Sequence, residues 1–97
     1  MHLKMKTIDI EGDKFYLNDN GYLNREDGPA IEYLSGEKFW FNNGEPHRDD
    51  GAAFIGKDGK EYWLFGKKAV GDEIKNIKRN KLFNDILDQD GWTFINL

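Results

Sequence analysis

The sequence predicts a mainly β protein: an antiparallel meander of three repeated β-hairpins, a short, kinked helical segment and a final strand or tail. Three observations predict this fold. A unit of about 23 residues recurs, each copy has aromatic residues between glycine turns, and the periodicity becomes helix-like after Gly71. The 97 residues support a single domain, with hairpin repeats in 1–66, the helical segment in 67–91 and the terminal strand or tail in 92–97.

The repeat emerges when the chain is aligned with itself. The copies read GDKFYLNDNGYLNREDGPA, GEKFWFNNGEPHRDDGAA and the shorter GKEYWLFGKKAV. Spacings of 24 and 23 residues separate the leading glycines, Gly12, Gly36 and Gly59. The same spacings separate the aromatic pairs, Phe15-Tyr16, Phe39-Trp40 and Tyr62-Trp63. Spacings of 23 and 22 separate the trailing glycines, Gly21, Gly44 and Gly66. So many matched positions indicate a repeat architecture.

Each copy predicts one β-hairpin. Runs of aromatic and β-branched residues flank a short turn in each copy, at Glu11-Gly12-Asp13, Ser35-Gly36-Glu37 and Lys57-Asp58-Gly59-Lys60. We therefore expect six strands within residues 6–66. Because a single hairpin is only marginally stable, the three are expected to stack in one sheet.

The C-terminal third predicts helix. Asp72-Glu73 favours a helix start and Gly91 a stop. One apolar stripe contains Val70, Ile74 and Ile77, and a nearly opposite stripe contains Leu82, Phe83, Ile86 and Leu87. A straight helix cannot bury both stripes on one sheet, so we expect a break near Arg79-Asn80, with the second stripe packed over the sheet. Residues 92–97 are expected to form a last strand or a packed tail.

The composition excludes several classes of function. The chain has no cysteine, which excludes disulfides and cysteine-based zinc sites. No signal-like segment or membrane-length apolar run is present, so we expect a cytoplasmic protein with no membrane partner. The net charge of −4 makes nucleic acid an unfavoured partner. His2 and His47 have no second ligand at a useful spacing, so no metal or cofactor is expected.

The segment His47-Arg48-Asp49-Asp50 has two interpretations. It could place a general base beside an orienting carboxylate, or it could be a turn that lacks catalytic residues. The equivalent loop has Asn24 in place of the histidine, which favours the turn. We therefore predict a protein that is not an enzyme. The predicted structural turn residues are Arg25, Asp27, Gly28, Arg48, Asp50 and Gly51, with aspartate bound to backbone N–H groups and glycine at positive φ.

Strand alternation predicts two aromatic rows on opposite faces. One row contains Phe15, Phe39 and Tyr62, and the other contains Tyr16, Trp40 and Trp63. Because the C-terminal segment can cover only one face, the second row is either an exposed binding surface or is buried by curling of the repeat. The sequence leaves both outcomes open.

Charged side chains suggest two further surfaces. Glu26, Asp49 and Glu45 predict an acidic loop edge next to the second row, which could also mimic nucleic acid in a basic groove. The basic run Lys75, Lys78, Arg79 and Lys81 either meets an acidic partner or forms a solvated helix face.

The unit G-x-K-x-W-x-x-N-G-x-x-H-R-x-D-G-P-A resembles MORN-like repeats, in the variant common in small bacteriophage and giant-virus proteins, and is similar to antitoxin-type hairpin repeats. The resemblance covers about residues 11–66. The copies depart from it at Asn24, where the unit has His, and at Ala52, where the first copy has Pro29. The resemblance implies successive hairpins in an elongated sheet that binds protein or membrane.

Together these observations predict a non-enzymatic protein-binding module, a phage-encoded counter-defence inhibitor of a host or anti-phage defence protein. Its partner-binding residues would be Tyr16, Trp40, Trp63, Glu26, Asp49 and Glu45. The alternatives are an antidote that neutralises a toxin, a structural or homo-oligomerising repeat protein, and an acidic nucleic-acid mimic.

Overall fold

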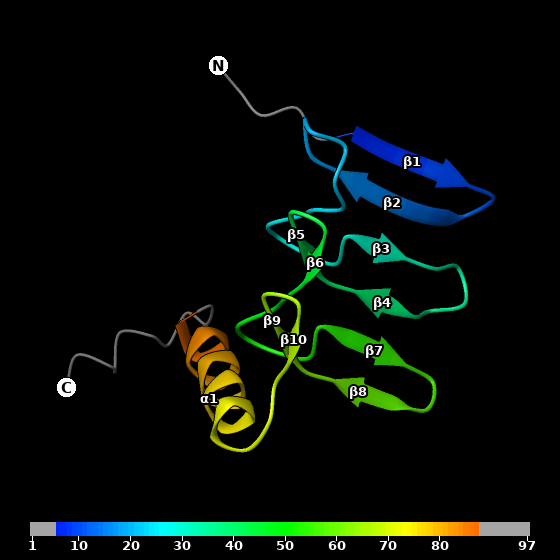
Figure 1. Cartoon of the computed structure of the whole chain (residues 1–97). Helices are drawn as coiled ribbons and strands as arrows, with labels where there is room; N and C mark the ends of the chain where they lie inside the picture. Colours follow the sequence, from blue (N-terminus) through cyan, green and yellow to red (C-terminus); the bar gives the residue numbers. More distant parts are fainter. Residues whose placement is uncertain (1–5, 88–97) are drawn as a thin grey trace.

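The computed structural model describes residues 6–87, which form a β meander followed by one helix (Figure 1). The strands are β1 (Lys6–Ile10), β2 (Asp13–Leu17), β3 (Ile31–Glu32), β4 (Lys38–Phe39), β5 (Phe41–Asn42), β6 (Glu45–Pro46), β7 (Phe54–Gly56), β8 (Gly59–Glu61), β9 (Trp63–Leu64) and β10 (Lys67–Lys68). The helix is α1 (Asp72–Leu87). The predicted mainly β fold with hairpins and a C-terminal helix is confirmed.

The second and third repeats each contain two hairpins, a larger one and a smaller one. One hairpin of each repeat joins an antiparallel six-stranded sheet of order β1-β2-β3-β4-β7-β8, whereas β5-β6 and β9-β10 form separate two-stranded hairpins. The turns of the small hairpins, Asn43-Gly44 and Phe65-Gly66, have positive φ at both residues. This conformation is typical of type I′ turns, whose twist matches that of the flanking strands. The sequence analysis predicted only the larger hairpins.

The third repeat is one residue shorter than the second in its main hairpin. Ile31 lies opposite Phe39 in the second repeat, whereas Phe54 lies opposite Glu61 in the third. Glu61 therefore occupies the position of Phe39, and Tyr62 that of Trp40. The backbone agrees, because the carbonyl of Trp40 accepts a hydrogen bond from His47 N and that of Tyr62 accepts one from Ala69 N. The predicted equivalence of Trp63 with Trp40 is wrong by one residue.

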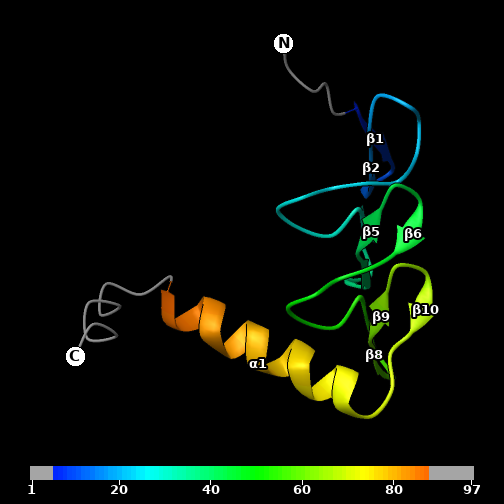
Figure 2. The ribbon, with the colours of Figure 1, turned by 60° about the vertical axis from the view of Figure 1, so that its left-hand side comes forward.

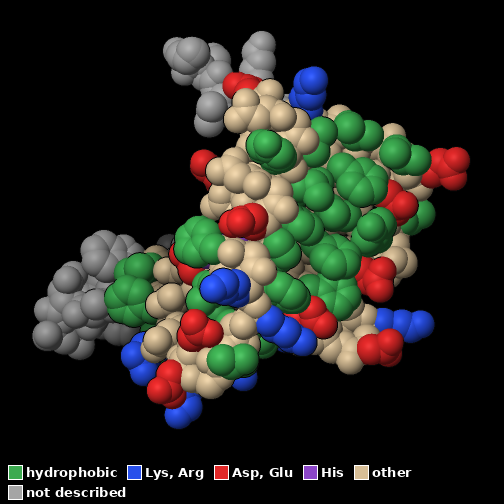
Figure 3. Space-filling view, viewed as in Figure 1, with side chains coloured by type: hydrophobic (Ala, Val, Ile, Leu, Met, Phe, Trp, Pro, Cys, Tyr) green, Lys and Arg blue, Asp and Glu red, His purple; other side chains and the backbone are tan. Residues whose placement is uncertain are grey.

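The register divides the six-stranded sheet into two faces. Phe15, Ile31, Phe39 and Phe54 lie opposite one another in successive strand pairs and share one face. We call this the apolar face, and it also contains Ile8 and Tyr33 by strand alternation. Its aromatic rings form a chain, with centroid distances of 6.1 Å from Phe15 to Tyr33, 5.8 Å to Phe39 and 4.4 Å to Phe54. Figure 3 shows this face without a second layer over it.

The opposite face contains Tyr16, Trp40 and Tyr62, and we call it the capped face. Loops of the first two repeats and helix α1 project toward the same side of the molecule, one for each repeat (Figure 2). The buried hydrophobic residues of the described chain are few and mostly small: Ala30, Ile31, Ala52, Ala53, Ala69 and Ile77. The loops can therefore pack close to the sheet, but they do not build a deep core.

Helix α1 is continuous, so the predicted break near Arg79-Asn80 is wrong. The predicted helix start is confirmed, and Glu73 accepts a hydrogen bond from Val70 N. The first stripe packs through Ile77, which is only 2% exposed, and Ile74, which is half-buried, whereas Val70 is 67% exposed. In the second stripe, Leu82 and Phe83 are 62% and 54% exposed. The helix extends away from the sheet (Figure 2), so its second half is beyond reach of it.

Two further expectations concern the ends of the chain and the membrane. The helix stop at Gly91 and the final strand in 92–97 lie outside the described residues. Within residues 6–87, no helix is long and apolar enough to cross a bilayer.

Ile77→Ala is expected to be strongly destabilising, because Ile77 has the most fully buried large side chain in the described chain. Truncation of a buried isoleucine costs about 2–5 kcal/mol, a large share of the roughly 5–15 kcal/mol available to a small domain. The matched control is Leu82→Ala, an exposed apolar residue of the same helix, which should change stability by less than about 0.5 kcal/mol. Urea unfolding measures both, and a loss for Leu82→Ala as large as that for Ile77→Ala would show that the second stripe is packed as well.

Candidate functional site

A cation covers an aromatic ring of the capped face in each repeat. The Cζ of Arg25 lies 4.0 Å from the ring centroid of Tyr16, and that of Arg48 lies 4.0 Å from the ring of Trp40. Both distances are typical of cation–π contacts. Tyr16 and Trp40 are half-buried. The outer side of each ring is thus occupied by a guanidinium group, which leaves neither ring as a bare docking surface.

The two arginines are held by the same pair of bonds. The Nε of Arg25 is 3.2 Å from Asp27 Oδ1, and its Nη1 donates to the carbonyl of Pro29 at 3.1 Å. The Nε of Arg48 is 3.0 Å from Asp50 Oδ1, and its Nη1 donates to the carbonyl of Ala52 at 3.1 Å. The planar fork of donors suits this geometry, which a lysine could not reproduce. Each aspartate therefore orients an arginine. The backbone hydrogen bond expected from the sequence is present at Asp50 and is not among the described contacts of Asp27.

Gly28 and Gly51 are required for a different reason from the one predicted. Neither is among the glycines at positive φ. A Cβ at Gly28 would lie 3.0 Å from the Cζ of Arg25, and one at Gly51 would lie 2.6 Å from the Cζ of Arg48. Each guanidinium is thus sandwiched between a glycine and an aromatic ring. The glycine makes room for the cation.

The first two repeats share the element Arg-x-Asp-Gly, at Arg25–Gly28 and Arg48–Gly51. The third repeat has no such element, and α1 takes its place. The Nζ of Lys78 lies 5.7 Å from the ring centroid of Tyr62. Tyr62 rather than Trp63 therefore completes the aromatic row, and Trp63 instead donates from Nε1 to Glu61. The sequence analysis placed Tyr62 in the opposite row and Lys78 in the basic run, and it missed the contact between them. The spacing of 22 between Gly44 and Gly66 was the available signal, since it aligns Trp40 with Tyr62.

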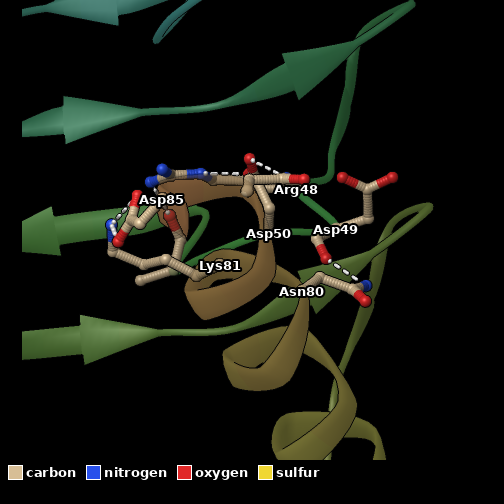
Figure 4. A network of polar contacts seen from close by, with 8 residues as sticks. Arg48, Asp49, Asp50, Asn80, Lys81 and Asp85 are labelled. Atoms are coloured by element: carbon tan, nitrogen blue, oxygen red, sulfur yellow. Dashed lines mark hydrogen bonds and ion pairs between the residues drawn. The ribbon is translucent and has the colours of Figure 1, made fainter. Parts of the chain in front are cut away.

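Helix α1 is also fastened to the second loop (Figure 4). Asn80 Nδ2 donates to the carbonyl of Asp49 at 2.8 Å, and Asn84 Nδ2 donates to Asp50 Oδ2 at 3.1 Å. Partial burial alone would raise the pKa of Asp50. The hydrogen bonds from Arg48 and Asn84 outweigh this effect, and the pKa lies below its ordinary value. The carboxylate thus joins the loop arginine to the helix.

The basic run of α1 does not act as one patch. Lys78 faces Tyr62, Lys81 pairs with Asp85 at 3.2 Å, and Lys75 lies 4.0 Å from Asp72. The last two pairs are exposed contacts within the helix, of the kind that contributes little to stability. This arrangement fits the interpretation of the run as a solvated helix face.

A groove of about 1040 Å³ separates the loops of the first two repeats. It brings together the predicted acidic residues Glu26 and Asp49, beside Trp40, with amide side chains along its walls. Glu45 does not line it and lies instead near Gly66. Among residues 6–87, no group of three or more histidines, cysteines and carboxylates is arranged to hold a metal ion.

His47 is positioned by an aromatic turn rather than by a carboxylate. Its Nδ1 accepts a hydrogen bond from Phe65 N at 3.0 Å, and its ring stacks on that of Phe65 at 3.9 Å. Phe65 has a φ of 46°, which is uncommon for an aromatic residue. The histidine therefore supports the turn of the β9-β10 hairpin. The hydrogen bond between His47 and an aspartate, on which the catalytic interpretation depended, is not among its contacts.

No protein-family model, curated protein or solved structure matches the chain. The likeness to MORN-like and antitoxin-type repeats therefore stays a prediction.

Gly51→Ala should destabilise the protein by about 1–3 kcal/mol, the scale of an overpacked site. The added Cβ would push the Arg48 guanidinium off its ring. Gly28→Ala is the matched control, and its smaller overlap predicts a smaller loss. The direction of the change in stability is informative, because replacing a glycine by alanine where the backbone accepts it without strain stabilises a protein by about 0.4–1 kcal/mol. Urea unfolding midpoints measure the change, and a gain in stability for Gly51→Ala would contradict the packing of Arg48 between Gly51 and Trp40.

Asp50→Asn should make stability less sensitive to acid. The pKa of Asp50 is lowered in the folded protein, so its ionised form stabilises the fold above the unfolded pKa, and this contribution is lost as pH falls through the folded pKa. The variant should be less stable than the parent near neutral pH. The gap should narrow as pH falls below about 4, the ordinary range of an aspartate pKa. Urea midpoints across this range test the expectation, and a gap independent of pH contradicts it.

Proposed function

We propose that the chain is a non-enzymatic protein-binding module that holds its partner on the apolar face of the six-stranded sheet. The observation that carries the proposal is the continuous chain of half-buried rings from Phe15 to Phe54, with no described second layer over it. Contiguous apolar surface of this kind marks interaction sites, and aromatic residues dominate binding energy. This location replaces the Tyr16-Trp40-Trp63 row, because the rings of Tyr16 and Trp40 are already covered by arginines.

The border of the apolar face indicates the chemistry of the partner. The register places Asp13 beside Ile10 and Glu61 beside Phe54 on this face, and Glu37 is bonded to Tyr33 at its edge. Figure 3 shows acidic side chains along the outer border. A complementary partner has an apolar patch flanked by lysines or arginines. Two copies of this chain stacked face to face would bring acidic borders together, so a different protein is the better occupant.

The role that we assign to this contact is occlusion of a host or anti-phage defence protein by a phage-encoded inhibitor. The resemblance to repeats of small bacteriophage proteins supports this role. Neutralisation of a toxin by an antidote is the same physical act and is the alternative. The two roles differ in the partner: an inhibitor lowers the activity of a defence protein, whereas an antidote lowers the toxicity of a protein made with it.

Variants of the apolar face should weaken partner binding without unfolding the domain. Leu34→Asp changes a side chain that is 75% exposed at the tip of the β3-β4 hairpin, where Leu34 N donates to Asp13 at the border of the apolar face. Phe39→Ala removes the central ring of the chain. Each should raise the Kd roughly tenfold or more, the effect of about 1.4–2 kcal/mol at a binding hot spot. Leu82→Asp is the control, since it places the same charge on exposed apolar surface of α1.

The measurement is titration calorimetry with a partner isolated by tagged capture, identified by mass spectrometry and purified. Circular dichroism checks that each variant is folded. Unchanged affinity for Leu34→Asp and Phe39→Ala, together with loss of binding for Leu82→Asp, would move the partner surface to the helix.

A further inference from the structure

Strand β1 forms an open edge of the six-stranded sheet. It is the outermost strand among the described residues, it has five residues, and all five are exposed. The other edge, β8, has only three residues, one of them glycine and one lysine. Short strands with such residues resist pairing with another chain, whereas a longer open strand invites it. The apolar side chains of β1, Ile8 and Ile10, are 41% and 56% exposed.

The hydrogen bonds of β2 show which groups of β1 face outward. Tyr16 N donates to the carbonyl of Ala30, and the carbonyl of Tyr16 accepts from Asn24 N, so both groups of Tyr16 point away from β1. Thr7 is paired with Tyr16. It therefore occupies a non-hydrogen-bonded position, and its own N–H and C=O point away from the sheet. Asp9, two residues further on, faces the same way.

These two outward residues select one register for pairing with a second copy. An antiparallel pair centred on Ile8 places Thr7 of each copy opposite Asp9 of the other, so the outward groups of both residues are satisfied. A pair centred on Thr7 would place Asp9 opposite residue 5, outside the described strand, and a pair centred on Asp9 would put two aspartates opposite each other. In the register centred on Ile8, Lys6 faces Ile10 and no like charges are opposed.

The same register joins the two apolar faces. Ile8 of one copy lies opposite Ile8 of the other at a non-hydrogen-bonded position, where side chains of paired strands approach most closely. Ile8 is on the same face as Phe15, which it opposes across β1 and β2. The sheet and its apolar face would thus continue from one copy into the next.

We propose that two copies of this chain form a two-fold symmetric dimer through antiparallel pairing of their β1 strands about Ile8. The interface is isologous, since the same residues of each copy meet. It adjoins the proposed partner face through Ile8, and the pairing can be measured with the chain alone.

Thr7→Pro tests the backbone pairing, because it removes one outward N–H and leaves the inward bonds of β1 in place. Thr7→Val is the matched control, which keeps the N–H. Light scattering over a dilution series should show a dimer for the parent chain and for Thr7→Val. Thr7→Pro should dissociate at roughly tenfold or more higher concentration.

Ile8→Lys and Ile8→Glu test the register and remain informative if the proline variant fails to fold. Each places like charges at the two-fold axis and should be monomeric alone, whereas an equimolar mixture should form a heterodimer. A parent chain that is monomeric at every concentration would overturn the proposal. It would also be overturned by a dimer that survives Ile8→Lys, or by a mixture that stays monomeric.

Discussion

A guanidinium held between a glycine and an aromatic ring fastens each of the first two loops of this protein to its sheet. A cation–π contact contributes about 0.5–2 kcal/mol, depending on how far it is removed from water. The hydrogen bonds from each arginine to a carboxylate and a carbonyl add to it. These contacts matter here because the described chain buries only six hydrophobic residues, four of them alanines. Within residues 6–87, the loops and the helix cover the capped face, and the clamped cations hold them there.

The clamp also determines which face of the sheet is left for other molecules. Ala30 and Ala53 are almost fully buried, so the backbone of each loop approaches the sheet closely. Arg25, Arg48 and Lys78 then cover one ring each. With the rings of this face covered, the broad apolar surface of the sheet remains on the opposite side (Figure 3). A single-layered sheet with one apolar face normally packs against another layer, and the described residues do not supply one.

The repeat and its main hairpins could be predicted from the sequence because turn residues act locally. Turns are indicated at Gly12, Gly36 and Gly59 whichever register the flanking strands adopt. The pairing of Phe54 with Glu61 could not be predicted so readily, because a turn shortened by one residue shifts every following side chain to the other face. The apolar pattern of α1 revealed two stripes, but which half of the helix stays within reach of the sheet depends on the direction in which the chain leaves Gly71.

The location of the exposed face was missed for a different physical reason. Alternation correctly separated Phe15 and Phe39 from Tyr16 and Trp40. It did not show which row was covered, because the groups that cover Tyr16 and Trp40 are arginines. A hydrophobic pattern treats arginine as a surface residue, although its planar group can pack on a ring. The signal lay in the element Arg-x-Asp-Gly itself, which combines a cation, a carboxylate that orients it and a residue without a side chain.

The two ends of the repeat array differ in structure, and this difference limits how copies can assemble. At one end, α1 replaces the third loop, places Lys78 over Tyr62 and bonds to Asp49 and Asp50. Terminal units of repeat proteins commonly differ in this way from the internal ones. At the other end, the outward backbone groups of Thr7 and Asp9 on β1 have no strand partner among the described residues. A sheet with two long open edges can grow into a filament, whereas here β8 has only three residues, one of them glycine and one lysine, so pairing through β1 closes on a second copy. The array is therefore finite because its last strand is short, while α1 fastens the third repeat to the second loop.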